Sequence, residues 1–132
     1  MNREILFRGK QKGNGMWLCG DLRQWSETRK GICDYALKHT IEVDSATVGQ
    51  YTGMTDKNGK RIFEGDILHF DYTGKHLGVE GAAPVIFENG KFGVKWGWHK
   101  DFVCLDGFAN TTMEIVGNIH DNPELLGGAQ DG

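Results

Sequence analysis

Apolar and polar positions alternate along short runs of this chain, and glycine-containing turns separate the runs. In the clearest run, large apolar residues alternate with glycine, lysine and histidine from residue 92 to residue 99. This period of two is the pattern of a β-strand whose side chains point alternately to its two faces. Twenty glycines against two prolines indicate brief strands and tight turns along the rest of the chain. The pattern therefore predicts a mainly β protein in which helix is the minority element.

Three Asn-Gly pairs stand between apolar runs and predict three β-hairpins. Asn-Gly favours a tight type I′ turn because both residues tolerate the positive φ that this turn requires. In the first hairpin, Ile5 and Phe7 are expected to share a face of the strand. The predicted hairpins join residues 4–8 to 16–21, 50–54 to 61–63, and 85–87 to 92–99.

Further elements are expected around these hairpins. Strands are predicted at residues 67–72 and 113–116, and Gly117 then marks a bulge or a turn. Residues 123–126 are typical of one short helical turn that begins with proline. The stretch 23–40 has no clear pattern, so most of it stays unassigned.

Strands joined by short polar turns favour a small β-barrel or a sandwich. We expect residues 45–126 to form a compact SH3-like barrel, with residues 1–44 as an N-terminal β-rich portion packed on it. Residues 127–132 contain nothing to bury and are expected to be a loose tail. A chain of 132 residues can bury enough apolar surface to fold without a disulfide or a metal.

Composition narrows the cellular setting. The formal net charge is -3 and the 15 basic residues are scattered, which argues against a general electrostatic grip on nucleic-acid backbones. The three cysteines are widely spaced, as expected for free thiols in a reducing cytoplasm rather than for a secreted disulfide framework. No apolar run is long enough for a signal peptide or a membrane span. We therefore expect a soluble cytoplasmic protein that does not enter a membrane.

Metal, phosphate and nucleophile chemistry find little support in the sequence. His99 with Cys104, and His120 with Asp121, match no zinc-site spacing. The glycines lack the spacing of phosphate-binding loops, and no nucleophile-elbow motif is present. We expect no metal, no cofactor and no enzymatic activity.

Paired carboxylates keep one enzymatic alternative open. Glu64, Asp66 and Asp71 fall close together along the chain, and two such groups can serve as acid and base. The favoured role of Asp66 is nevertheless structural, because aspartate beside a glycine turn commonly bonds nearby backbone amides.

The candidate binding surface is the aromatic and basic stretch Lys95, Trp96, Trp98, His99 and Lys100. Aromatic rings beside cations are what a single-stranded nucleic-acid platform uses, because bases stack on the rings while the cations meet phosphates. A stripe of large apolar residues at strand period is more often a core or a subunit interface. The sequence leaves open whether the tryptophans belong to a core, an interface or a ligand platform.

The stretch from Thr47 to Ile67, TVGQYTGMTDKNGKRIFEGDI, resembles the signature of the YopX family of small bacteriophage and prophage proteins. Residues 3–9, 17–21, 114–119 and 122–126 are also similar to that family in content and order. The resemblance implies a phage or prophage origin and an SH3-type barrel in the C-terminal part. It implies no catalytic or ligand-binding residues.

These observations favour a phage or prophage accessory protein that binds a macromolecule without catalysing a reaction. A protein partner is favoured, either a second copy of the chain or a host or phage protein, because exposed aromatics anchor interfaces and barrel edges invite pairing. A nucleic-acid-binding small barrel and an enzyme with a carboxylate site are the alternatives.

Overall fold

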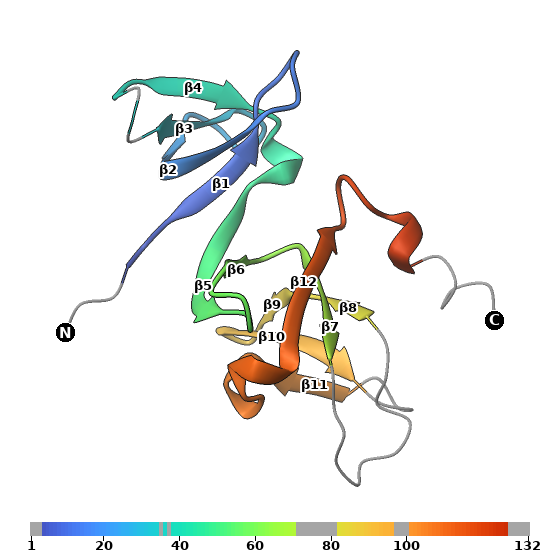
Figure 1. Cartoon of the computed structure of the whole chain (residues 1–132). Helices are drawn as coiled ribbons and strands as arrows, with labels where there is room; N and C mark the ends of the chain where they lie inside the picture. The colour runs from blue at the N-terminus through green and yellow to red at the C-terminus, as the bar shows by residue number, and fades with distance from the viewer. Residues whose placement is uncertain (1–3, 35, 37, 71–81, 97–100, 127–132) are drawn as a thin grey trace, which may run out of the picture. The chain divides into compact units, whose positions relative to one another are not determined.

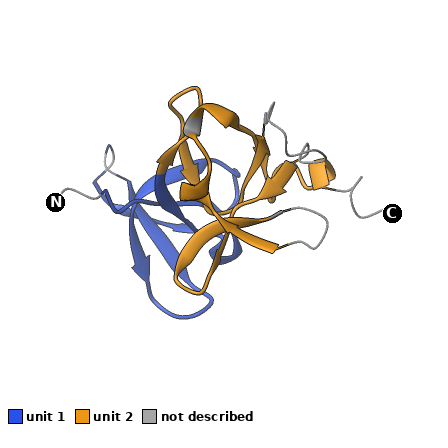
Figure 2. Cartoon of the chain, turned by 90° about the horizontal axis from the view of Figure 1, so that it is seen from below, with its two compact units in different colours: residues 1–53 blue, residues 54–132 orange. Residues whose placement is uncertain are grey.

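The computed structural model describes residues 4–34, 36, 38–70, 82–96 and 101–126 (Figure 1). The chain forms two compact units, residues 1–53 and residues 54–132 (Figure 2). Strands dominate both units, so the predicted mainly β fold is confirmed. In the part of the chain that the structure describes, no helix is long and apolar enough to cross a membrane.

Unit 1 is an antiparallel sheet whose strands run in the order β4-β3-β2-β1-β5. The β1–β2 hairpin is the first predicted one, with Phe7 opposite Gly20. Its first strand begins only at Phe7, and Ile5 lies ahead of it with 55% of its surface exposed, so the expected shared face stays a prediction. The elements are β1 (Phe7–Lys10), β2 (Trp17–Gln24), β3 (Lys30–Asp34), β4 (Thr40–Val43), the 3-10 turn η1 (Ser45–Thr47) and β5 (Gly49–Thr55), which continues into unit 2.

The core of unit 1 lies on the face of β2 that carries its even-numbered residues. Leu18 is buried there with Ile32 and Val43, while the odd-numbered residues from Cys19 to Arg23 point to the exposed face. Gly9 lets Val43 approach β1, since a Cβ on Gly9 would lie 2.7 Å from Val43 Cγ2. The partly buried residues packed against this core are Phe7, Leu22, Ile41 and Val48.

Unit 2 contains two three-stranded antiparallel sheets, in the orders β11-β10-β9 and β12-β7-β8. Among its described residues the sheets do not close into a barrel. Residues 124–126 form the predicted helical turn after Pro123. The elements are β6 (Arg61–Phe63), β7 (Asp66–Phe70), β8 (Ala82–Pro84), β9 (Ile86–Glu88), β10 (Lys91–Trp96), β11 (Asp101–Cys104), η2 (Leu105–Gly107), η3 (Asn110–Thr112) and β12 (Met113–Asn118).

The two remaining predicted hairpins are confirmed, with different turns. Asn89 and Gly90 both have positive φ, 53° and 80°, as a type I′ turn between β9 and β10 requires. In the turn between β5 and β6, Gly59 has positive φ, 78°, whereas Asn58 does not. Asp56 there donates its N–H to the carbonyl of Lys60 at 2.9 Å, which closes the hairpin.

Strand β12 is also confirmed, together with the irregularity at Gly117. Ile115 pairs with Leu68 of β7 and Gly117 pairs with Ile67, so Val116 is the extra residue of a bulge. The exposed fraction of Val116 is 42%, because the bulge turns its side chain out of the ladder.

Two of the four residues of the predicted apolar stripe, Phe92 and Val94 of β10, belong to the core of unit 2. Val94 is completely buried and Phe92 packs against the same cluster, so this face of β10 is core at these two positions. Trp98 lies outside the described residues. The buried cluster consists of Ile62, Leu68, Phe70, Ala83, Val85, Val94, Leu105 and Met113.

The division between the units differs from the expected boundary after residue 44. Residues 45–53 belong to unit 1, because Gly49 and Gln50 of β5 pair with β1. The turn η1 precedes them, and Asp44 caps it by accepting the N–H of Ala46 at 3.1 Å. The expected tail at 127–132 lies outside the described residues.

Candidate binding surfaces

The structure describes only part of the predicted surface. Lys95 is exposed on β10, where its Nζ lies 3.1 Å from Glu88 Oε2 of β9. Trp96 ends β10 opposite Asp101 of β11. Trp98, His99 and Lys100 lie outside the described residues, so a shared face with Lys95 stays a prediction.

The β9–β10 hairpin presents an exposed aromatic residue that the sequence reasoning did not single out. Phe87 pairs directly with Phe92, and their ring centroids lie 4.8 Å apart at an interplanar angle of 59°. Phe92 packs on the core, whereas 52% of the Phe87 surface is exposed. The ring of Phe87 is therefore held in place from one side and open to solvent on the other.

The opposite face of β10 is partly covered by Phe102 of β11. A Cβ on Gly93 would lie 2.6 Å from Phe102 Cζ and 2.4 Å from the carbonyl oxygen of Val103. Only glycine therefore lets the Phe102 ring lie against this strand, and that contact fixes β11 beside β10. Phe102 pairs with Lys95, so its ring occupies the side of the sheet on which Lys95 projects.

The structure describes two of the three candidate acid/base carboxylates, the partly buried Glu64 and the buried Asp66. Asp66 is 2% exposed, and its Oδ2 accepts the buried N–H of Phe63 at 2.8 Å across the Glu64-Gly65 turn. Gly65 has φ 93°, the left-handed conformation that glycine adopts without strain. The predicted structural role of Asp66 is confirmed, and Asp71 lies outside the described residues.

A second buried aspartate, Asp56, escaped the sequence reasoning except as a source of local turn bonds. Its Oδ1 accepts the N–H groups of Asn58 at 2.9 Å and Lys60 at 3.0 Å, which confirms the local bonds. Its Oδ2 accepts the N–H of Ile115 on β12 at 3.0 Å. Burial alone would raise the pKa of Asp56, but the backbone donors outweigh it and lower the pKa below its ordinary value.

Asp56 therefore joins the β5–β6 turn to a strand that lies far along the chain. Lys57 adds a parallel link, because its N–H donates to the carbonyl of Met113 at 2.8 Å. Lys57 Nζ also lies 3.4 Å from Glu114 Oε1 in an exposed ion pair. Both buried aspartates of the segment 47–67 thus accept backbone hydrogen bonds that set the course of the chain.

In unit 1, Trp25 lies over the exposed face of the sheet beside several cations. A Cβ on Gly31 would lie 2.8 Å from Trp25 Cη2, so the tryptophan ring rests where β3 has no side chain. Arg23 pairs with Gly31 from β2, and the Arg29 guanidinium carbon lies 5.1 Å from the Trp25 ring centroid. We call Lys12, Arg23, Trp25 and Arg29 the Trp25 surface.

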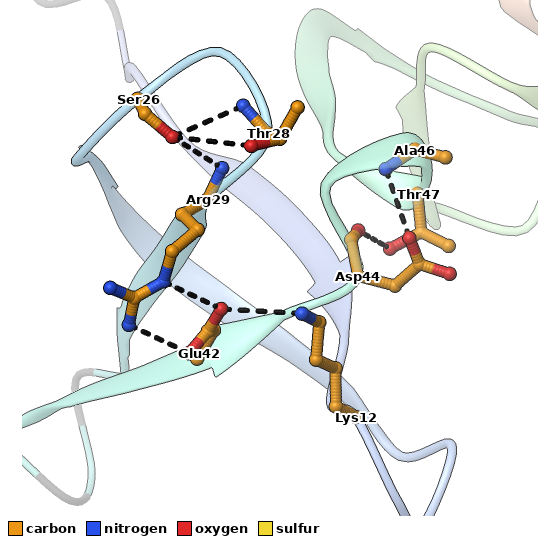
Figure 3. A network of polar contacts seen from close by, with 8 residues as sticks. All are labelled: Lys12, Ser26, Thr28, Arg29, Glu42, Asp44, Ala46 and Thr47. Atoms are coloured by element: carbon orange, nitrogen blue, oxygen red, sulfur yellow. Dashed lines mark hydrogen bonds and ion pairs between the residues drawn. The ribbon is translucent and has the colours of Figure 1, made fainter.

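One carboxylate, that of Glu42, binds two cations of the Trp25 surface, Arg29 and Lys12 (Figure 3). Arg29 donates to Glu42 through Nε at 3.2 Å and Nη2 at 3.0 Å, and Lys12 Nζ donates to Glu42 Oε2 at 3.3 Å. The hydrogen bond from Arg29, followed by that from Lys12, lowers the pKa of Glu42 to about 2. Ser26 Oγ accepts the Arg29 N–H at 3.0 Å and so holds the turn that carries this arginine.

A second tryptophan of β2 also stacks with cations. The Arg8 guanidinium carbon lies 4.7 Å and Lys10 Nζ 5.9 Å from the Trp17 ring centroid. Register places all three on one face, because Arg8 is opposite Cys19 and Lys10 is opposite Trp17. Arg8 and Trp17 lie within the predicted hairpin, but the predicted first strand ends at residue 8, which left Lys10 out of this face.

Unit 2 ends in an exposed segment that is apolar and acidic. Val116, Ile119 and Leu125 are 42%, 38% and 42% exposed, and Asp121 and Glu124 lie between them as exposed acids. We call these five residues the Leu125 surface.

Hydrogen bonds hold the chain of the Leu125 surface in place. Asn118 Oδ1 accepts the N–H groups of His120 at 3.0 Å and Asp121 at 2.9 Å, and Asn122 Oδ1 accepts the N–H of Asn118 at 3.2 Å. A Cβ on Gly117 would lie 2.9 Å from Leu125 Cδ1, so Leu125 folds back against the end of β12.

Cys19, Cys33 and Cys104 carry thiols and not disulfides, and Cys104 is partly buried at the end of β11. Across the described residues, no group of three histidine, cysteine, aspartate or glutamate side chains is placed to hold a metal ion. His99, one of the spacing candidates, lies outside them.

These features define a small β protein with two compact units. The buried carboxylates of Asp56 and Asp66 accept backbone hydrogen bonds, and the rings of Trp25 and Phe87 are exposed. The chain belongs to the YopX family, whose family model, described as YopX protein, matches residues 6–127. This confirms the resemblance of the 47–67 segment.

Among solved structures, the crystal structure of protein EF1440 from Enterococcus faecalis is similar to this chain, with 23% sequence identity and a TM-score of 0.55. The similarity covers 95% of this chain and 99% of that one, and it shows a shared fold alone. No curated protein gives a significant match.

Proposed function

We propose that this YopX-family protein is a non-enzymatic binding module of a phage or prophage, and that it recognises protein. It acts in the cytoplasm of the bacterial host, and the finer architecture that we propose for residues 45–126 is an open SH3-like barrel, since the described sheets do not close. The observation that carries the proposal is the ring of Phe87, which is packed on Phe92 and still 52% exposed. A large aromatic held rigidly at a surface loses little conformational freedom when a partner covers it.

The state of the buried carboxylates supports the non-enzymatic part of the proposal. A general acid or base needs a free lone pair or proton directed at a reactant. Both oxygens of Asp56 accept backbone N–H groups, and an oxygen of Asp66 is bound to the Phe63 N–H. The lowered pKa of Asp56 also keeps it ionised at neutral pH, where a general acid must hold a proton.

The composition of the hairpin around Phe87 supports a protein partner over nucleic acid. Lys95 is already paired with Glu88, so among the described cations of this hairpin only Lys91 is left for a phosphate backbone. An aromatic anchor beside a balanced ion pair is typical of a protein interface with an apolar centre and a polar rim.

Affinity capture from host cells with the intact chain, with and without nuclease treatment, tests the proposal. The expected result is a protein that the wild-type chain captures both with and without nuclease treatment. The Phe87→Ser variant is expected not to capture it. Ile5→Ser is the matched control, because Ile5 is equally exposed at 55% but precedes the strands of unit 1. Capture that nuclease abolishes would overturn protein recognition, and capture that Phe87→Ser leaves intact would overturn the assignment of Phe87.

A further inference from the structure

We propose that the chain associates head to tail with a second copy of itself, the Trp25 surface of one copy binding the Leu125 surface of the next. This inference goes beyond the recognition assigned to Phe87 and uses other residues. It rests on the complementary charge and the exposed apolar side chains of two prearranged surfaces, one in each unit.

The two units carry opposite formal charge. Unit 1 has eight lysine and arginine residues and six aspartate and glutamate residues, a formal net charge of +2. Unit 2 has seven lysine and arginine residues and twelve aspartate and glutamate residues, a formal net charge of -5. Basic residues of one copy are therefore attracted to the acidic unit of another, which increases the association rate and selects the orientation.

The Trp25 surface has the composition of an interface centre. Tryptophan and arginine are the residues that most often dominate binding energy in protein interfaces. Trp25 is 44% exposed and already packed over Gly31, and Glu42 already orients Arg29. Arg23 is exposed on the adjacent strand and adds a cation, so the surface is aromatic and positive before any partner arrives.

The Leu125 surface supplies the matching chemistry. Its exposed apolar side chains can cover the Trp25 ring, while Asp121 and Glu124 can meet the exposed Arg23. The bonds made by Asn118 and Asn122 fix this segment, so little ordering is required on association. Neither surface resembles the other, and an interface between unlike surfaces of identical chains is heterologous, so it builds rings or open chains of copies.

Mixing two interface variants of the intact chain tests the inference. Trp25→Ser keeps the Leu125 surface, and Leu125→Ser keeps the Trp25 surface, so each variant alone is expected to weaken self-association by at least ~10-fold. An equimolar mixture retains one intact interface per pair of chains. Sedimentation is expected to show two-copy particles in the mixture and single copies in either solution alone.

A second pair of variants covers the case in which Trp25→Ser or Leu125→Ser disturbs the fold. Arg23→Glu and Glu124→Lys change only exposed charges, and the double variant in one chain is expected to recover association that each single variant loses. Phe87→Ser is expected to leave self-association unchanged.

Three outcomes would overturn the inference. They are single copies for the wild type, no recovery on mixing, and equal association of wild type and all four variants. The proposed recognition through Phe87 fails separately, because its readout is the nuclease-resistant partner and not the mass of the purified chain.

Discussion

Replacing Asp56 is expected to loosen the attachment of β12 to the β5–β6 turn. Asp56 is 2% exposed and accepts three backbone N–H groups, from Asn58, Lys60 and Ile115. A hydrogen bond to a charged group contributes about 1.5–3 kcal/mol net, and the Ile115 bond lies between strands where water cannot replace it easily. Water can reach the exposed loop donors, so each of those two bonds contributes less, roughly 0.5–1 kcal/mol.

Asp56→Ala is therefore expected to lower the free energy of unfolding by about 3–4 kcal/mol. Asp56→Asn keeps an acceptor for the loop but directs an amide group at Ile115, so its expected loss is about 2 kcal/mol. The measurement is urea unfolding followed by circular dichroism, with hydrogen exchange of the Ile115 amide as the local readout. Asp44→Asn is the control, because Asp44 is exposed and its side chain caps η1 through the N–H of Ala46.

The acid dependence of the same variants follows from the lowered pKa of Asp56. A depressed pKa stabilises the fold above the unfolded value, about 3.9 for aspartate, and this contribution is lost as pH falls through the lower folded pKa. The difference between wild type and Asp56→Asn should therefore shrink below about pH 4. A variant as stable as wild type at neutral pH, with an equally protected Ile115 amide, would refute the reasoning.

Gly20→Ala should lower the free energy of unfolding of unit 1 by about 3 kcal/mol or more in urea, because the new Cβ would overlap the carbonyl of Cys33. A free energy within ~0.5 kcal/mol of wild type would contradict this contact. Asp66→Asn should speed exchange of the buried Phe63 amide, and unchanged exchange would show that the Asp66 carboxylate is not the acceptor that protects it. NMR titration should find the Glu42 carboxyl half-protonated near pH 2, so its stabilising contribution is present above the ordinary glutamate pKa and lost through about 2. A midpoint in the ordinary range would show that the Glu42 network does not persist in solution.

Elements fixed by local chemistry were predictable from the sequence. Asn89-Gly90 forms its tight turn because its two residues accept positive φ, whatever lies around them. Asp66 bonds across a turn of its own, three residues away, so the turn rules suffice. The helical turn after Pro123 belongs to the same group.

Features that depend on distant packing were not predictable. Asp56 bonds Ile115, 59 residues away, and nothing near Asp56 in the sequence indicates that partner. β3 was missed because glycine and a cysteine interrupt its apolar pattern, and Gly31 is explained only by the Trp25 ring above it. Phe87 stood in a predicted strand, yet its exposure depends on where the edge of the sheet falls.

The central claim is that the buried aspartates of the 47–67 segment hold the backbone and leave recognition to exposed aromatic rings. Carbon-13 NMR titration of the Asp56 side-chain carboxyl in the intact chain measures this most directly. The account predicts a carboxylate that stays ionised throughout the neutral range, with a midpoint below the ordinary aspartate value of about 3.9. A midpoint raised toward neutrality would contradict it, because that behaviour belongs to a carboxyl prepared to donate a proton.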